Sequence, residues 1–236
     1  MIAGLQKMTL LDYPGKVACT VFLQGCNFRC PFCHNSGLLG APEQPPISTE
    51  ELLDFLKKRQ GLLDGVCITG GEPTLHKELP DLLRQIKDLS FAVKLDTNGY
   101  RPDVLKALVC DGLVDYVAMD IKNCPDRYAE TAGIPNLDIS KIEDSMVFLM
   151  EGELDFEFRT TVVQQFHGTK ELEAIGLWFQ KLSPEHKVKK YFLQPYTDRD
   201  SVLCGGLCAP NKADLLTFQD IAAAYVHNVE IRGVAV

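Results

Sequence analysis

The chain has 236 residues, of which 46% are hydrophobic and 24% are charged, a size and composition that suit one sizeable hydrophobic core. Its net charge of −8 argues against a broad surface for nucleic acid or for an anionic membrane, because both surfaces need an excess of Lys and Arg. No apolar run approaches the roughly 20 residues of a membrane-spanning helix, and the N-terminus lacks the pattern of a signal peptide, so we expect a cytoplasmic protein.

Stretches that are rich in β-branched and apolar residues alternate along the chain with stretches of helical periodicity. Ser48 and Glu51 form a capping-box pattern that predicts the start of the first helix. Strands are expected at residues 16–25, 65–71, 91–99, 113–122, 154–163 and 188–196, with a short strand at 228–233. Helices are expected at residues 48–60, 78–89, 102–110, 139–151, 169–182 and 211–226.

This alternation predicts βα units and a parallel sheet with right-handed crossovers. Six strand–helix pairs are too few for a closed barrel of eight, so an open or partial barrel is expected. The predicted fold class is therefore α/β, a partial (β/α)6 barrel in a single parallel-stranded domain over residues 1–236. Within this domain, residues 24–40 form a cysteine-containing loop, and the residues from about 198 onward form a C-terminal extension.

Unusual polar and glycine-rich segments follow the predicted strands, each near the point where a strand ends. In a parallel α/β sheet, ligands gather at the carboxyl ends of the strands, so these segments are expected to meet at one functional site. They are, in chain order, Cys26–Cys33, "TGGEP" (69–73), "DTNG" (96–99), "MDIK" (119–122), Arg159 within its strand, and "QPYTD" (194–198).

Three of the nine cysteines, Cys26, Cys30 and Cys33, lie within eight residues of one another. Disulfides are rare in the cytoplasm, so the cysteines are better interpreted as metal ligands, reactive thiols or small core residues, and the close spacing of these three favours a metal centre. A structural zinc ion needs four ligands, and His34, directly beside Cys33, is an awkward fourth. An iron–sulfur cube normally takes four cysteines, so a set of three would leave one iron open to an exchangeable ligand. Cys19, Cys67, Cys110 and Cys124 are scattered and are expected to be small core residues.

The pattern Cys-x3-Cys-x2-Cys, with Phe32 before the last cysteine, resembles the signature of radical S-adenosylmethionine enzymes. The resemblance implies one 4Fe-4S cluster held by the three cysteines, with S-adenosylmethionine on the open iron and its reductive cleavage to a 5′-deoxyadenosyl radical. The turn "TGGEP" resembles a second motif of this family, which implies that Gly70, Gly71 and Glu72 meet the methionine ammonium. Residues 34–66 contain no cysteine, so no additional cluster is expected.

Three segments together, "CPFCHN", "LDTNG" and "MDIK", resemble the branch of this family that activates glycyl radical enzymes. The resemblance implies that Lys122 pairs with the carboxylate of the cofactor and that Arg159 contacts the cofactor or the glycyl substrate. It also places two further groups at the cofactor: Phe32 and His34 near the adenine, and Asp96, Asn98 and Asp120 at the mouth of the barrel. A monovalent cation near Asp96 and Asp120 is compatible with the same resemblance.

The opening of the chain, residues 2–35, resembles the activating proteins of the anaerobic ribonucleoside-triphosphate reductase. This implies that anaerobic ribonucleotide reductase is the partner and that a flavodoxin or ferredoxin donates the electron. Thr197 follows Pro-Tyr where activases of pyruvate formate-lyase carry a histidine, which disfavours that enzyme as the partner and puts a cofactor contact at this position in doubt.

Several alternatives stay open at this stage. They are an activase of another glycyl radical enzyme such as pyruvate formate-lyase, a radical enzyme that acts on a small molecule, and a zinc-binding module without catalysis. Cys204 and Cys208, in the loop "CGGLC", have no assigned role. A redox pair, half of a metal site, a docking element and two ordinary loop cysteines are all compatible with their spacing.

Overall fold

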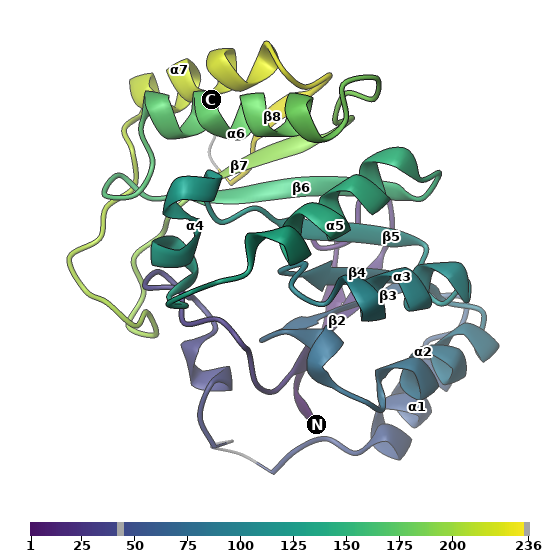
Figure 1. Ribbon diagram of the computed structural model, residues 1–236. Coiled ribbons are helices and arrows are strands. Elements are labelled where there is room, and N and C mark those ends of the chain that lie inside the picture. Colours follow the sequence, from purple (N-terminus) through teal and green to yellow (C-terminus); the bar gives the residue numbers. More distant parts are fainter. Residues whose placement is uncertain (42–44, 234–236) are drawn as a thin grey trace. The chain divides into compact units, whose positions relative to one another are not determined.

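A computed structural model describes residues 1–41 and 45–233, which divide into two compact units (Figure 1). The first unit comprises residues 1–27, 35–97 and 101–118. The second comprises residues 28–34, 98–100 and the chain from 119 onward. The division cuts through the cysteine loop, because Cys26 belongs to the first unit whereas Cys30 and Cys33 belong to the second.

The first unit is built on a sheet whose hydrogen-bonded order follows the chain. Its strands are β1 (Ile2–Thr9), β2 (Ala18–Leu23), β3 (Gly65–Gly70), β4 (Ala92–Thr97) and the start of β5 (Tyr116–Asp120). β2, β3 and β4 pair in parallel, with Ala18 opposite Gly65 and Gly65 opposite Ala92. β2 is almost wholly buried, as expected for an inner strand of a parallel sheet.

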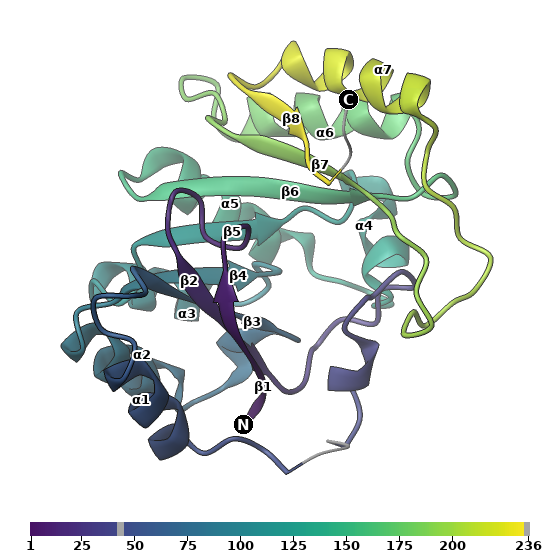
Figure 2. The same cartoon turned by 180° about the vertical axis from the view of Figure 1, so that it is seen from behind.

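Strand β1 was not predicted, and it pairs antiparallel with β2 as a hairpin, seen in purple in Figure 2. Gly4 and Lys7 interrupt the alternation of apolar and polar residues that would reveal a strand, and Lys7 and Met8 are exposed. A strand at the edge of a sheet can be formed by such a sequence because only one of its sides needs a partner.

The helices of the first unit are α1 (Thr49–Lys57), α2 (Leu79–Asp88) and α3 (Pro102–Cys110), with two short 3-10 helices at Ser36–Leu38 and Pro73–Leu75. The predicted capping box is confirmed: Glu51 N donates to Ser48 Oγ at 3.1 Å, and Ser48 N donates to Glu51 Oε2 at 2.8 Å. α2 buries its apolar face against α1 and β4, so the helices cover the sheet as βα units require (Figure 1).

The second unit continues the same pattern with parallel strands. β5 ends here, and β6 (Asp155–Val162), β7 (Tyr191–Pro195) and β8 (Val229–Ile231) follow in chain order. Phe158 lies opposite Tyr191, and Tyr191 lies opposite Val229. The helices of this unit are α4 (Pro125–Ala132), α5 (Ile139–Glu151), α6 (Thr169–Leu182) and α7 (Lys212–Ala223).

Helix α4 is the one long element of this unit that was not predicted. Its sequence, "PDRYAETA", has too few apolar residues to show helical periodicity. It is positioned by its C-terminal end, where Arg29 N donates to Ala132 O at 2.9 Å. Gly133 ends the helix with a φ of +66°, and a Cβ there would lie 2.2 Å from Arg29 O. The helix therefore holds one side of the cysteine loop.

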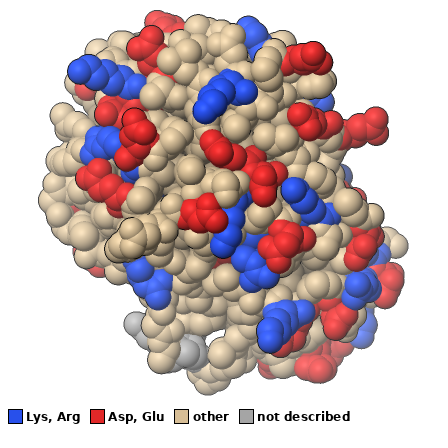
Figure 3. Space-filling view, viewed as in Figure 1, with Lys and Arg blue, Asp and Glu red and all other residues tan. Residues whose placement is uncertain are grey.

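Acidic and basic side chains are interspersed over the face of the molecule seen in Figure 3. This face has no field of a single sign. Within residues 1–41 and 45–233, no helix is both long and apolar enough to cross a membrane.

Candidate functional site

The cysteine loop follows β2 directly, at the carboxyl end of that strand. None of the three cysteines forms a disulfide; Cys30 is buried, and Cys26 and Cys33 are half-buried. Cys33 N donates to Cys30 O at 3.1 Å, which closes a turn between the last two cysteines. Across the described residues, no group of three or more His, Cys, Asp or Glu side chains is placed so that it could hold a metal ion. The role of the three cysteines as cluster ligands stays a prediction.

Two glycines of the "TGGEP" segment approach the start of the cysteine loop within the first unit. Glu72 N donates to Gly25 O at 2.8 Å. A Cβ on Gly71 would lie only 1.9 Å from Gly25 O, so only glycine fits there. Gly70 has a φ of +121°, a conformation that residues with a Cβ rarely adopt. Both glycines are therefore required for the turn to pack against the residue that precedes Cys26.

Glu72 is fully buried, and its carboxylate stabilises the turn by hydrogen bonds. Its Oε1 accepts hydrogen bonds from Thr74 N at 3.1 Å, from the Thr74 hydroxyl, and from Thr97 Oγ1 at 2.8 Å. These contacts tie the turn to the end of β4. Glu72 was predicted to accept from a cofactor ammonium, and that role stays a prediction beside the structural role found here.

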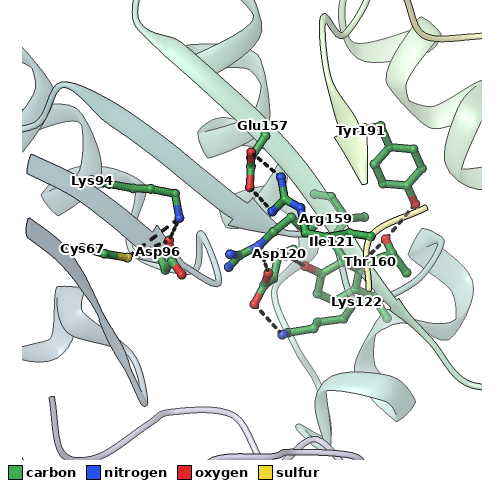
Figure 4. Close-up of polar contacts among 12 residues, drawn as sticks. Cys67, Lys94, Asp96, Asp120, Ile121, Lys122, Glu157, Arg159, Thr160 and Tyr191 are labelled. Carbon is green, nitrogen blue, oxygen red and sulfur yellow. Dashed lines mark hydrogen bonds and ion pairs between the residues drawn. The ribbon is translucent and has the colours of Figure 1, made fainter. Parts of the chain in front are cut away.

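Asp120, at the end of β5, lies between two cations of the second unit (Figure 4). Arg159 Nε donates to Asp120 Oδ1 at 2.9 Å, and Lys122 Nζ donates to Asp120 Oδ2 at 3.0 Å. Burial alone would raise the pKa of the Asp120 carboxyl, but the attraction of Arg159 and then of Lys122 lowers it to about 2. The carboxylate is therefore ionised at any physiological pH.

Lys122 connects this ion cluster to the cysteine loop. Burial would lower the pKa of Lys122, but the Asp120 carboxylate and then the Cys30 thiol raise it above its ordinary value. The structure thus brings together four of the predicted residues, namely Cys30, Asp120, Lys122 and Arg159. Lys122 is therefore positively charged at any physiological pH.

The backbone that carries Arg159 is fixed by neighbouring strands (Figure 4). Ile121 N donates to Arg159 O at 2.8 Å, and Thr160 Oγ1 donates to Ile121 O at 2.7 Å. On the same strand, the fully buried Glu157 accepts from Arg232 at 2.8 and 3.1 Å. The Glu157–Arg232 pair was not predicted; "VEIRG" near the C-terminus was its only sequence signal.

His34 is held by the segment that follows β7, and its place near the adenine stays a prediction. Its Nε2 lies 2.7 Å from Thr197 O, and its ring stacks on Tyr196 with a centroid distance of 5.6 Å. Burial lowers the pKa of His34. Ser201 Oγ donates to His34 O at 2.8 Å. The main chain of Thr197 makes this contact, so the absence of a histidine side chain at 197 does not remove the link to the cysteine loop.

The same segment brings the unassigned "CGGLC" loop against the cysteine loop. Cys204 N donates to Pro31 O at 3.0 Å, and Cys208 N donates to Gln165 Oε1 at 3.1 Å. Both thiols are exposed and free. Only main-chain atoms of the two cysteines make these contacts, so the role of the thiols stays open.

Three other predicted residues have local contacts. Phe32 is buried and its ring lies 6.0 Å from that of Phe166. Asn98 Oδ1 accepts from Tyr100 N at 3.0 Å, which makes Asn98 the residue that stabilises the "DTNG" turn. Asp96 forms an ion pair with Lys94 in the first unit.

Of the four scattered cysteines, Cys19, Cys67 and Cys124 are buried as predicted. Cys110 is exposed, so its assignment to the core was wrong. It is the last residue of α3, whose buried residues are Leu105 and Leu108.

The residue types present are those that bind an iron–sulfur cluster and S-adenosylmethionine, and their meeting in one site stays a prediction. Three cysteines without disulfides lie within eight residues, and thiolate sulfur is the donor that binds the irons of such a cluster. Gly71 lies so close to Gly25 that a Cβ at this position would meet main-chain atoms of Gly25 and Cys26. Lys122 and Arg159 supply positive charge for an anionic group.

Comparisons with known proteins identify the family of the chain. The chain matches the family description "Radical SAM superfamily" over residues 20–156. A protein of Methanocaldococcus jannaschii that is provisionally named a glycyl-radical enzyme activating enzyme is 30% identical, over 98% of this chain and 95% of its own. The pyruvate formate-lyase-activating enzyme of Clostridium pasteurianum is 34% identical over 53% of each chain.

Solved structures show the same fold. A domain of the pyruvate-formate lyase-activating enzyme from Bacteroides vulgatus superposes with a TM-score of 0.58 at 20% identity, covering 72% of this chain and 99% of its own. SuiB of Streptococcus suis, bound to its precursor peptide, superposes with a TM-score of 0.70 at 13% identity, covering 91% of this chain and 48% of its own. The predicted α/β fold with a parallel sheet is confirmed.

Proposed function

The chain belongs to the radical S-adenosylmethionine superfamily, and from this premise we propose that it is an activating enzyme that forms a glycyl radical on a partner enzyme. The observation that carries the proposal is the likeness of nearly the whole chain to a relative whose name gives that activity. The "TGGEP" turn, seated on the residue before Cys26, supports it from the structure.

The proposal assigns Cys26, Cys30 and Cys33 to one 4Fe-4S cluster. It assigns the binding of S-adenosylmethionine to ten further residues, namely Phe32, His34, Gly70, Gly71, Glu72, Asp96, Asn98, Asp120, Lys122 and Arg159. When bound, the reduced cluster and S-adenosylmethionine supply a 5′-deoxyadenosyl radical, which takes the α-hydrogen from a glycine of the partner. Cofactors of this kind carry the difficult chemistry, and the protein supplies orientation and electrostatics.

The residues of this chain have distinct tasks in that scheme. Glu72 holds the glycine turn to the end of β4 through the two threonine contacts. Asp120 orients Lys122 and Arg159, and both cations keep the site positive beside Cys30. Because Lys122 and Arg159 stay charged at every physiological pH, they would bind the carboxylate of the cofactor without a proton transfer.

The partner we propose is the anaerobic ribonucleoside-triphosphate reductase, with a flavodoxin or ferredoxin as electron donor, in the cytoplasm. The opening stretch at residues 2–35 supports this choice over pyruvate formate-lyase, as does Thr197 in place of histidine. An activase of pyruvate formate-lyase is the second candidate, favoured by the likeness of half of the chain to such an enzyme.

The first experiment is an anaerobic assay on protein with a reconstituted cluster. It is reduced with dithionite, S-adenosylmethionine is added, and 5′-deoxyadenosine is measured by chromatography. We expect product from the wild type and none from Cys30→Ala, whereas Cys110→Ala, which removes an exposed thiol at the end of α3, keeps the activity. Zinc in place of about four irons per chain would overturn the proposal in favour of a structural module.

The partner is tested by electron paramagnetic resonance. The activated protein is mixed with the anaerobic reductase or with pyruvate formate-lyase, and the glycyl radical signal is recorded for each. A signal with the reductase alone supports the partner proposed here, and a signal with the formate-lyase alone would replace it. If 5′-deoxyadenosine forms with a small molecule and with neither partner enzyme, the protein is a radical enzyme that acts on a small molecule, and the activase proposal is wrong.

A further inference from the structure

The positive charge beside the Asp96 carboxylate comes from a lysine of the same strand, Lys94. Lys94 Nζ forms an ion pair with Asp96 Oδ1 (Figure 4). The Lys94 side chain is 1% exposed and that of Asp96 is 14% exposed, so the pair is shielded from solvent. An ammonium group buried to this degree needs an opposite charge, because transferring it from water is otherwise costly. The carboxylate of Asp96 provides that charge.

Strand geometry brings the two side chains of this pair to the same face of β4. Lys94 and Asp96 are two residues apart on β4, so their side chains leave the same face of the strand. Cys67 lies opposite Lys94 on the parallel neighbour β3. Its Sγ is 3.9 Å from Lys94 Nζ and 3.7 Å from Asp96 Oδ1, so the thiol contacts both members of the ion pair. The three side chains form a set whose formal charges cancel.

A monovalent cation at Asp96 does not fit this arrangement. The ion would have to share the Asp96 carboxylate with an ammonium group that is already paired with it, and the two positive charges would repel each other. The other carboxylate considered for the ion, Asp120, is bound by Lys122 and Arg159 within the second unit. Each carboxylate thus has a protein cation as its partner.

We propose that the Lys94 ammonium takes the place of a monovalent cation beside Asp96, so that the protein binds S-adenosylmethionine without an alkali metal ion. Lys94 is a positioning residue in this scheme: it acts on the cofactor through Asp96, whose orientation at the end of β4 it holds. The inference rests on the proposed function, since it requires Asp96 to lie at the cofactor.

The test compares salts. The affinity of the cluster-loaded wild type for S-adenosylmethionine is measured by calorimetry in KCl, NaCl and choline chloride at matched ionic strength. We expect the same affinity in all three salts. Lys94→Met should bind about tenfold to a hundredfold more weakly in choline chloride, the range expected for one lost charge-assisted contact. KCl or NaCl should restore part of that loss, because a small cation can enter the space that the ammonium leaves.

Cys67→Ala is the matched control, because it removes the thiol from the same cluster and keeps the ion pair. It should show no dependence on the alkali ion. A wild type that needs K⁺ or Na⁺ for affinity would overturn the proposal. A Lys94→Met protein that binds weakly in all three salts would also overturn it, since that outcome indicates a merely structural lysine.

A second measurement separates this inference from the proposed function and needs no variant. Thermal unfolding of the cluster-free wild type is followed in the same three salts. A bound ion stabilises the native state and raises the midpoint, so equal midpoints support the inference and a higher midpoint in KCl or NaCl overturns it. If the wild type binds no S-adenosylmethionine in any salt, the proposed function fails, while the unfolding midpoints still report on the ion.

Discussion

Replacing Gly71 with alanine tests the contact on which the candidate site depends. The added Cβ would lie 1.9 Å from Gly25 O and 2.5 Å from the carbonyl carbon of the same residue, whereas ordinary van der Waals contact begins at 3.4 Å. Both atoms belong to the main chain, so no side chain can rotate away to make room. The turn and the start of the cysteine loop would have to separate.

The cost can be estimated from these contacts. Overpacking of a tight site typically costs about 1–3 kcal/mol. Separation also breaks the hydrogen bond from Glu72 N to Gly25 O, at 2.8 Å, and such a bond contributes about 1 kcal/mol. We therefore expect Gly71→Ala to lower the free energy of unfolding by roughly 2–4 kcal/mol. The variant should also incorporate less iron, because the loop that begins at Cys26 is displaced.

The assay is urea unfolding of the cluster-free protein, followed by iron analysis after anaerobic reconstitution. Gly37→Ala is the matched control: a Cβ there meets nothing within 4 Å, so its stability should stay within about 0.5 kcal/mol of the wild type. A Gly71→Ala protein as stable as that control, with a full iron content, would refute the reasoning.

Three further predictions concern single interactions. Although burial favours the neutral carboxyl, Arg159 and the neighbouring lysine lower the pKa of Asp120 from 3.8 to about 2. The ionised carboxylate therefore stabilises the fold fully above pH 3.8, and this stabilisation is lost as the pH falls toward 2. The stability gap between wild type and Asp120→Asn, measured by urea unfolding, should therefore narrow over that window. Glu157→Gln should cost about 1.5–3 kcal/mol in the same assay, because it weakens the two charge-assisted bonds from Arg232. Ser48→Ala should cost about 1 kcal/mol by removing the cap of α1.

Each of these predictions has a result that would contradict it. A stability gap for Asp120→Asn that stays constant down to the lowest pH would mean that the ion cluster does not lower the carboxyl pKa. If Glu157→Gln lowers the free energy of unfolding by less than about 0.5 kcal/mol, the buried pair makes no net contribution to stability, which is known for some buried ion pairs. If Ser48→Ala lowers the free energy of unfolding no more than a substitution of an exposed residue such as Lys57→Ala, the cap does not stabilise α1.

Most of the fold could be predicted because its signals are local. The inner strands β2 and β3 are mostly apolar runs, β4 begins with Ala92 and Val93 and ends in the turn segment "DTNG", and α1 begins with a capping box, so all four elements were found. β1 and α4 were missed because their pairing and packing with neighbouring elements, and not their own periodicity, stabilise them. The extent of one domain over residues 1–236 stays a prediction beside the two compact units found here.

The amino-acid sequence by itself determined the chemical inventory: three cysteines at fixed spacing, a glycine turn after the next parallel strand, and cations at later strand ends. Spacing along one chain is a covalent property, so these features needed no tertiary information. Only the tertiary structure decided which charge meets which. Lys94 faces Cys67 because β3 and β4 pair in that register, and Asp120 lies between Lys122 and Arg159 because β6 lies beside β5. Register depends on the packing of whole strands, and a sequence pattern of period two leaves it undetermined.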